Sequence, residues 1–227
     1  MWPAFDHFHP ALVDGALSTD PLPPGPNIAP DFLGRRVCRI ICKPLLQNGE
    51  DAAMKLHIGS RERADGWKTL DINPGPQVDF VGDCKDLSQF PEGSIDIIYA
   101  SHVLEHLPYA RELPHALKEW FRVLKPSGRA MISVPDLETL CRLFLEAPVD
   151  ANGRFHLMRM MFGGQIDEHD FHCVGLTWEF LSAQLARAGF RRIDKVTSLG
   201  VFSDTSMLTF CGTLISLNVI AEKTVSP

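Results

Sequence analysis

The sequence predicts an α/β protein built around one mostly parallel sheet of seven strands. Two short apolar runs, 95–100 and 129–134, have the composition of strands that are buried on both faces. Between them, apolar residues recur at helical spacing over 113–124, and the Lys-Pro-Ser-Gly segment 125–128 ends that helix. A strand, a helix and a second strand in this order form a right-handed parallel crossover, the repeating unit of parallel sheets.

The other strands are short apolar runs along the rest of the chain. They are predicted at 56–58, 69–70, 78–81, 193–199 and 214–221. Only residues 60–68 separate the first two strands, so the helix between them is expected to be a single turn or missing. Near the end of the chain, Thr177 is expected to cap a helix that Gly189 closes.

Two segments differ from the rest of the chain. Residues 1–53 form an N-terminal arm that is expected to be partly irregular, because prolines crowd its middle. Residues 54–227 are expected to form the main domain, in which 139–175 is an insertion between the fifth strand and the next helix. This insertion is largely irregular in pattern and rich in apolar residues. It is expected to be a substrate lid or an ordinary helical cover.

Charge and cysteine content disfavour several classes of function. The formal net charge is −6, and no basic run stands out beyond 35–43, which disfavours a nucleic-acid partner. No apolar stretch approaches the ~20 residues of a membrane span. The 6 cysteines form no CxxC pair, as expected for reduced thiols in the cytoplasm. We therefore expect a cytoplasmic protein, and the sequence carries no signal for its oligomeric state.

Polar residues follow the two central strands at one edge of the predicted sheet. Ser101 and His102 come after the fourth strand, and Pro135 and Asp136 come after the fifth. In open parallel sheets, ligands bind outside the carboxyl ends of the strands. The sequence therefore predicts a ligand site at this edge.

Several motifs, taken in order, match one known family. They are the segments 55–59, 67–71, 78–83, 94–106, 122–128, 170–172 and 188–190. Their order and spacing resemble class I S-adenosylmethionine-dependent methyltransferases, especially the predicted small-molecule methyltransferases associated with glycan biosynthesis. The resemblance covers about residues 54–221. It implies a Rossmann-like fold, S-adenosyl-L-methionine as cofactor, and methyl transfer to a small molecule, such as a sugar or sugar-lipid hydroxyl.

The resemblance also implies roles for residues after the first two strands. Gly59 and Ser60 match the glycine turn where the backbone approaches the methionine part of the cofactor. Asp71, followed by Ile72, matches the acid whose carboxylate accepts the ribose hydroxyls. His57 stands where the family usually has an acid, and it is included among the expected cofactor contacts.

Further roles fall after the third and fourth strands. Asp83 matches the acid that faces the adenine amino group, and the backbone of Cys84 lies beside the ring. Ser101 and His102 match the floor beneath the methionine part. Taken alone, Asp71 and Asp83 would be read as ordinary turn acids at strand ends.

The first motif departs from the family pattern and keeps a second hypothesis open. Arg61 occupies the place of the second glycine, and Arg61 or Arg63 would then hold the cofactor's carboxylate. The alternative function is a non-catalytic binding module that kept the fold with a degenerate first motif.

Histidines are the candidate bases, since a hydroxyl acceptor must lose a proton and imidazole titrates nearest neutrality. His102 and His172 are the two candidates. His102 fits a structural floor residue equally well, and His172 fits a residue that orders its loop. His106 fits packing or capping better than catalysis.

A remote alternative is a zinc hydrolase. Residues 102–106 match HxxEH, a signature in which two histidines bind zinc and the glutamate acts as base. The match abuts a buried strand and is closed by Pro108, so it lacks the long helix of such enzymes. A second group, His169, Asp170 and His172, matches no ligand spacing closely, and no metal is expected.

Overall fold

The computed structural model describes residues 53–60, 63–146 and 149–224. The predicted arm, 1–53, lies outside the described residues except for its last position, and Arg61 lies outside them as well. In the described part of the chain, no helix is long and apolar enough to cross a membrane.

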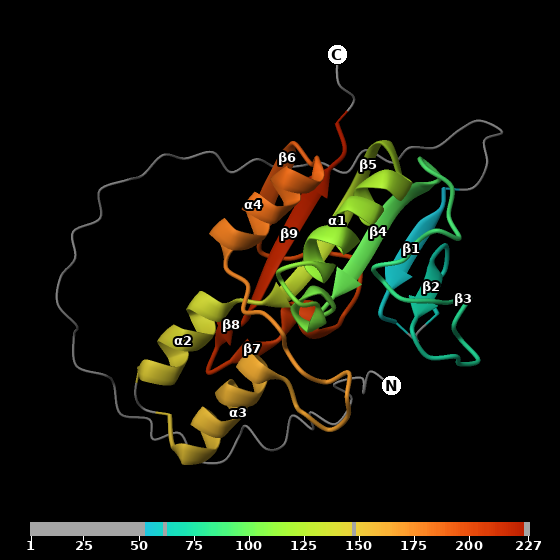
Figure 1. Ribbon diagram of the computed structural model, residues 1–227. Coiled ribbons are helices and arrows are strands. Elements are labelled where there is room, and N and C mark those ends of the chain that lie inside the picture. The colour runs from blue at the N-terminus through green and yellow to red at the C-terminus, as the bar shows by residue number, and fades with distance from the viewer. Residues whose placement is uncertain (1–52, 61–62, 147–148, 225–227) are drawn as a thin grey trace. The chain divides into compact units, whose positions relative to one another are not determined.

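One seven-stranded sheet carries the fold, as Figure 1 shows. Its strands are β1 (Lys55–Ile58), β2 (Lys68–Asp71), β3 (Phe80–Val81), β4 (Ile95–Ser101), β5 (Leu124–Pro135), β6 (Arg192–Val196) and β9 (Ser216–Glu222). Their spatial order is β3-β2-β1-β4-β5-β9-β6. The first five are parallel, and β9 runs antiparallel to both β5 and β6. The predicted fold class is therefore confirmed.

The strand order reverses between β1 and β4, which are neighbours in the sheet although two strands separate them in the chain. Chain segments leaving the carboxyl ends of these two strands diverge, and the divergence opens a crevice where ligands bind in sheets of this type. The topology thus places the expected ligand site after β1, β2 and β4.

Two helices, α1 (Glu112–Val123) and α4 (Trp178–Ala188), lie side by side over one face of the sheet (Figure 1). The predicted boundaries of α4 are confirmed, since Thr177 Oγ1 accepts a hydrogen bond from Phe180 N at 3.4 Å and Gly189 ends the helix with φ of 120°. The fully buried residues between helices and sheet include Leu56, Ile98, Leu117, Trp120, Leu181 and Leu185. Each such side chain contributes roughly 1.5 to 3 kcal/mol by leaving water.

One predicted turn is replaced by strand. Segment 125–128 was expected to separate α1 from a strand that begins at 129, but β5 begins at Leu124, directly after the helix. Ser127 adopts a left-handed φ of 66° there, and its N–H donates to Lys223 O at 2.7 Å. Pairing of this segment with the end of β9 therefore converts the turn into an irregular start of the strand.

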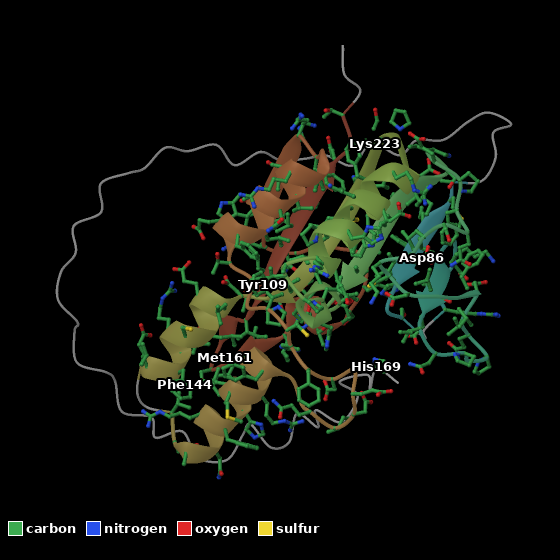
Figure 2. The ribbon with its side chains drawn as sticks, viewed as in Figure 1. Asp86, Tyr109, Phe144, Met161, His169 and Lys223 are labelled. Atoms are coloured by element: carbon green, nitrogen blue, oxygen red, sulfur yellow. The ribbon has the colours of Figure 1, made fainter. Side chains whose placement is uncertain are left out.

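The insertion 139–175 is more regular than its pattern indicated. It contains most of α2 (Leu137–Leu145) and all of α3 (Ala151–Phe162), which pack together beside the hairpin of β7 (Thr209–Phe210) and β8 (Thr213–Leu214). Their shared core is Leu140, Leu157, Met160 and Ile215. Figure 2 labels Phe144 on α2, Met161 on α3 and His169 on the loop that follows α3.

The connection from β1 to β2 holds no helix in the residues that the structure describes there. This agrees with the short spacing of the first two strands. The other face of the sheet at this end is covered by an aromatic cluster in place of a helix. His57, Trp67, Tyr99 and Phe202 make up that cluster.

His57 is turned toward this aromatic cluster because its neighbours Leu56 and Ile58 face the helices on the other side of the sheet. Its ring stacks on Phe202, with centroids 4.3 Å apart, and meets Tyr99 edge to face at 4.9 Å. Burial lowers the pKa of His57 from 6.5 to about 4, and the carboxylate of Asp204 opposes this shift in part.

We predict that His57 makes the protein less stable in mild acid. The unfolded chain takes up a proton at this residue below pH 6.5, whereas the folded chain takes it up only near pH 4, so stability is lost as the pH falls through this window. Between about pH 7 and pH 5 the loss is about 2 kcal/mol. His57→Phe keeps an aromatic ring and should remove this part of the pH dependence in urea unfolding. An unchanged pH dependence in the variant would contradict the assignment.

Candidate active site

A pocket lies at the carboxyl ends of β1, β2 and β3, where the sheet topology places the ligand crevice. Of the residues predicted to contact the cofactor, those that line it are Gly59, Asp71, Ile72, Asp83 and Cys84. Val103, His106 and Leu107 line it from the segment after β4, and Glu112 from the start of α1. The loop after α3 closes it with Glu168, His169, Phe171 and Cys173.

Two features exclude a side chain at Gly59: its backbone conformation and a close neighbouring residue. Its φ of 76° is left-handed, and an added Cβ would lie 2.6 Å from Val103 Cγ2. Its N–H donates to Leu70 O at 2.8 Å, which fixes the turn against the end of β2. Bare backbone therefore faces the pocket at the end of β1.

Asp71 ends β2 with its side chain only 1% exposed. Asn73 N donates to its Oδ1 at 2.8 Å, so the carboxylate is held in a local turn. Its carbonyl accepts from Gly82 N at 3.0 Å, which ties the ends of β2 and β3 together. The result is a fixed acceptor group on the pocket wall, beside the backbone of Gly59.

Asp83 and Cys84 form the far wall of the pocket. Asp83 Oδ1 accepts from Lys85 N at 3.1 Å, and Lys85 Nζ lies 3.3 Å from Asp83 Oδ2 and 2.7 Å from Glu112 Oε2. Trp120 Nε1 donates to Cys84 O at 2.8 Å and thereby anchors this wall to α1. Burial raises the pKa of the Cys84 thiol, so the group stays neutral and adds little polarity to the wall.

The other predicted site residues do not line this pocket. His57 faces the aromatic cluster on the opposite side of the sheet, and Ser60 lies next to the turn without reaching the wall. Ser101 Oγ lies 3.0 Å from Thr205 Oγ1. Asp136, also expected near the ligand, accepts from Thr139 Oγ1 at the start of α2.

His102 directly follows β4, with a left-handed φ of 55° and 8% exposure, and does not line the pocket. Its Nε2 is 3.1 Å from Ser216 Oγ, and its Nδ1 is 3.4 Å from Glu105 Oε1. Burial, reinforced by the nearby His172, lowers the pKa of His102 to about 3. The ring is therefore neutral at physiological pH and a weak base.

A cluster of Glu105, His106 and His172 lies at the rim of the pocket, to which His106 belongs. Burial raises the pKa of Glu105 to about 8. Burial and the neighbouring His172 lower the pKa of His106 to about 3, against the effect of carbonyl groups of Phe171 and His169. Burial also lowers the pKa of His172.

Sequence reasoning missed this cluster and the wall formed by the 168–173 loop. His106 was assigned to packing, because no local spacing connects it with His172. The density of acidic and histidine residues at 167–172 was the available signal, but only the fold shows which of them face the pocket.

The HxxEH interpretation is not supported by this geometry. A zinc hydrolase would need His102 and His106 as ligands one turn apart on a helix. Here Leu104–His106 is a single 3₁₀ turn, and the group of side chains close enough to share an ion includes His172 in place of His102.

Comparison with known proteins supports the resemblance seen in the sequence. A family model described as a methyltransferase domain matches residues 43–132. No curated protein matches the chain.

Several solved structures are distantly similar to this chain. A SAM-dependent methyltransferase from Archaeoglobus fulgidus is 19% identical over 76% of this chain and 86% of its own, with a TM-score of 0.49. A possible histamine N-methyltransferase from Thermotoga maritima is 18% identical over 79% and 84%, with a TM-score of 0.45. A possible exported protein from Bordetella parapertussis is 14% identical over 76% of this chain, which spans only 62% of that protein; the TM-score is 0.48.

The sheet order is typical of the class I methyltransferase fold, and residues 43–132 match a methyltransferase domain. This match implies an S-adenosylmethionine-dependent methyltransferase, EC 2.1.1.-, with S-adenosylmethionine as the methyl donor. The residues present fit that cofactor, because Gly59 leaves a cradle that a Cβ would fill and Asp71 offers a fixed carboxylate beside it.

We predict that Gly59→Ala destabilises the protein and abolishes cofactor binding. A left-handed alanine costs roughly 1 to 2 kcal/mol, and the overlap with Val103 adds to that cost. Gly66→Ala is the matched control, since Gly66 has the same φ of 76° with no atom within 4 Å of an added Cβ. Urea unfolding and calorimetry with S-adenosylhomocysteine would measure both effects. Equal stability and equal binding in the two variants would contradict the role of Gly59.

Proposed function

We propose that this domain transfers a methyl group from S-adenosylmethionine to a small-molecule acceptor, and that the pocket beyond β1, β2 and β3 holds the cofactor. The observation that carries the proposal is the pairing of Gly59 and Asp71 on one pocket wall. Bare backbone at Gly59 lets the methionine part approach closely. The carboxylate of Asp71 accepts hydrogen bonds from the ribose hydroxyls.

The remaining walls suit the other parts of the cofactor. Ile72 and Cys84 offer mostly apolar surface to the adenine ring, and Asp83 accepts from its amino group. Ser101 and His102 support the floor from below through Thr205 and Ser216. His57 and Ser60 are left out of the proposed contacts, because neither lines the pocket.

The chemical step requires mainly that the protein position the acceptor atom next to the methyl group. The bound sulfonium supplies an activated methyl group, so the chain must hold the acceptor atom in line at about 3 to 3.5 Å. A hydroxyl acceptor must also lose a proton. We propose that His102 is a positioning residue, because its ring is buried against Ser216, and that the acceptor hydroxyl lies beside His106, the histidine close to it in sequence that lines the pocket.

The acceptor that the sequence resemblance suggests is a sugar or sugar-lipid hydroxyl, and this is the hypothesis for an acceptor screen. Methyl transfer from radiolabelled S-adenosylmethionine to sugars, carboxylic acids and thiols would rank the classes. Labelling of sugars alone would support the hypothesis, and labelling of another class alone would replace it.

We also propose a cytoplasmic location. The cysteines of the described residues, Cys84, Cys141, Cys173 and Cys211, are all free thiols. Free thiols are typical of a reducing compartment. Fractionation of the native host would test this location.

We predict that Asp71→Asn weakens binding of S-adenosylhomocysteine by at least about tenfold, as expected for loss of a charged acceptor worth about 1.5 to 3 kcal/mol. The change is nearly isosteric and keeps an oxygen for Asn73 N. Asp194→Asn, on exposed β6, is the matched control. Calorimetry would measure both affinities, and unchanged affinity in Asp71→Asn would refute the ribose assignment.

Calorimetry and the acceptor screen together separate the enzyme from the non-catalytic alternative. Binding of S-adenosylhomocysteine without turnover of any acceptor would favour a binding module. Absence of binding at millimolar ligand would overturn the enzyme hypothesis.

A further inference from the structure

The carboxylate of Glu105 is an unusual buried group beside the pocket. Its side chain is 1% exposed, and neither oxygen accepts a hydrogen bond from the described residues. A buried polar group without a partner costs roughly 1 to 3 kcal/mol, and a charged one costs more. His102 Nδ1 lies 3.4 Å from Glu105 Oε1, but its ring is neutral, so the position calls for a proton on the carboxyl group or for a cation.

Two imidazole rings form a compact cluster with this carboxylate. One ligand atom from each of Glu105, His106 and His172 lies within 4.8 Å of the other two. The rings of His106 and His172 meet edge to face, with centroids 4.8 Å apart and planes at 89°. The cluster therefore offers a metal ion one oxygen ligand and two nitrogen ligands, which come from two separate segments of the chain.

A backbone carbonyl contacts the ring of His106. His106 Nδ1 lies 3.1 Å from Phe171 O, and because a carbonyl only accepts, the neutral ring carries its proton on Nδ1 and its lone pair on Nε2. Burial lowers the pKa of His172, and the charge of Asp170 and the backbone of Met160 and Met161 oppose this shift in part. A histidine that donates one N–H to a carbonyl and presents its other nitrogen has the usual arrangement of a metal ligand.

Main-chain hydrogen bonds fix the two segments against each other. Cys173 N and Val174 N both donate to Glu105 O, at 2.7 and 3.2 Å. His172 N donates to Phe162 O at 3.2 Å. The short distance between Glu105 and His172 is thus built into the backbone and does not depend on surface side chains alone.

We propose that Glu105, His106 and His172 bind one divalent transition-metal ion at the rim of the methyl-donor pocket. Two imidazoles and one carboxylate suit Zn²⁺, Fe²⁺ or Mn²⁺, whereas Mg²⁺ and Ca²⁺ prefer an all-oxygen set. Ligand atoms around such an ion lie about 3.0 to 3.4 Å apart, given bonds of about 2.0 to 2.2 Å. The three groups must therefore approach one another by at most about 1.8 Å, which side-chain rotation can supply.

This site has a consequence for the acceptor, and that consequence rests on the proposed function. His106 belongs both to the cluster and to the pocket wall. Three protein ligands leave further coordination positions on the ion, as in catalytic zinc sites. An acceptor hydroxyl bound at such a position would lie beside the methyl donor and would lose its proton more easily.

Metal binding by the full chain tests the proposal without any methyl acceptor. The protein is stripped with a chelator, and Zn²⁺ and Mn²⁺ are titrated separately by calorimetry, with metal content checked by elemental analysis. We expect about one equivalent of at least one ion in the wild type. Glu105→Gln and His172→Ala should each weaken binding by at least about tenfold. His115→Ala is the matched control, because His115 is exposed on α1 outside the cluster, and it should bind like the wild type.

Each outcome of the metal titrations tests the metal site and not the methyltransferase activity. A wild type that binds neither ion, or a His172→Ala variant that binds as tightly as the control, would overturn the proposal. Thermal unfolding identifies a variant that fails to fold, and the loop variant His172→Ala then decides. Binding of S-adenosylhomocysteine is measured separately, so failure of the metal site and failure of the proposed function are distinguishable.

Discussion

The close contact between Gly59 and Val103 is the constraint on which the site depends. It brings the turn after β1 against the segment that follows β4, at the point where the strand order reverses. A side chain at Gly59 would force these two segments apart. Because the turn is also tied to Leu70 O, the same contact sets the distance from bare backbone to the carboxylate of Asp71.

The walls of the pocket are positioned by elements with different rigidity. Trp120, a fully buried residue of α1, anchors the Cys84 side, so that wall is part of the main core. The 168–173 loop instead rests on the backbone of Glu105 through two hydrogen bonds. An acceptor would therefore approach along the loop side, where His106 lies, while the cofactor would lie against the rigid side.

Much of the fold was predictable because its signals are local. Apolar runs, the Thr177 cap and the Gly189 stop depend on neighbouring residues, and the structure confirms them. The early start of β5 was not predictable, because pairing with Lys223 at the far end of the chain converts a turn into strand. A helical cover was one of the two expectations for the insertion, but the bounds of α2 and α3 were not predictable, since their core is completed by a distant hairpin.

The site residues that could be predicted from the sequence are those whose positions are determined by the end of a strand. Gly59, Asp71 and Asp83 follow three successive strands, and the structure brings them to one pocket. The orientation of His57 could not be read from its place in the motif, since alternation along β1 turns it to the other face. The proximity of His172 to Glu105 depends on backbone hydrogen bonds across a long separation in sequence.

A crystal structure with bound S-adenosylhomocysteine would locate the cofactor directly. We expect the ribose hydroxyls on the carboxylate of Asp71, the amino-acid part beside Gly59 and the adenine ring against Cys84. A ligand bound elsewhere, or bound in this pocket without contact to Asp71, would contradict it.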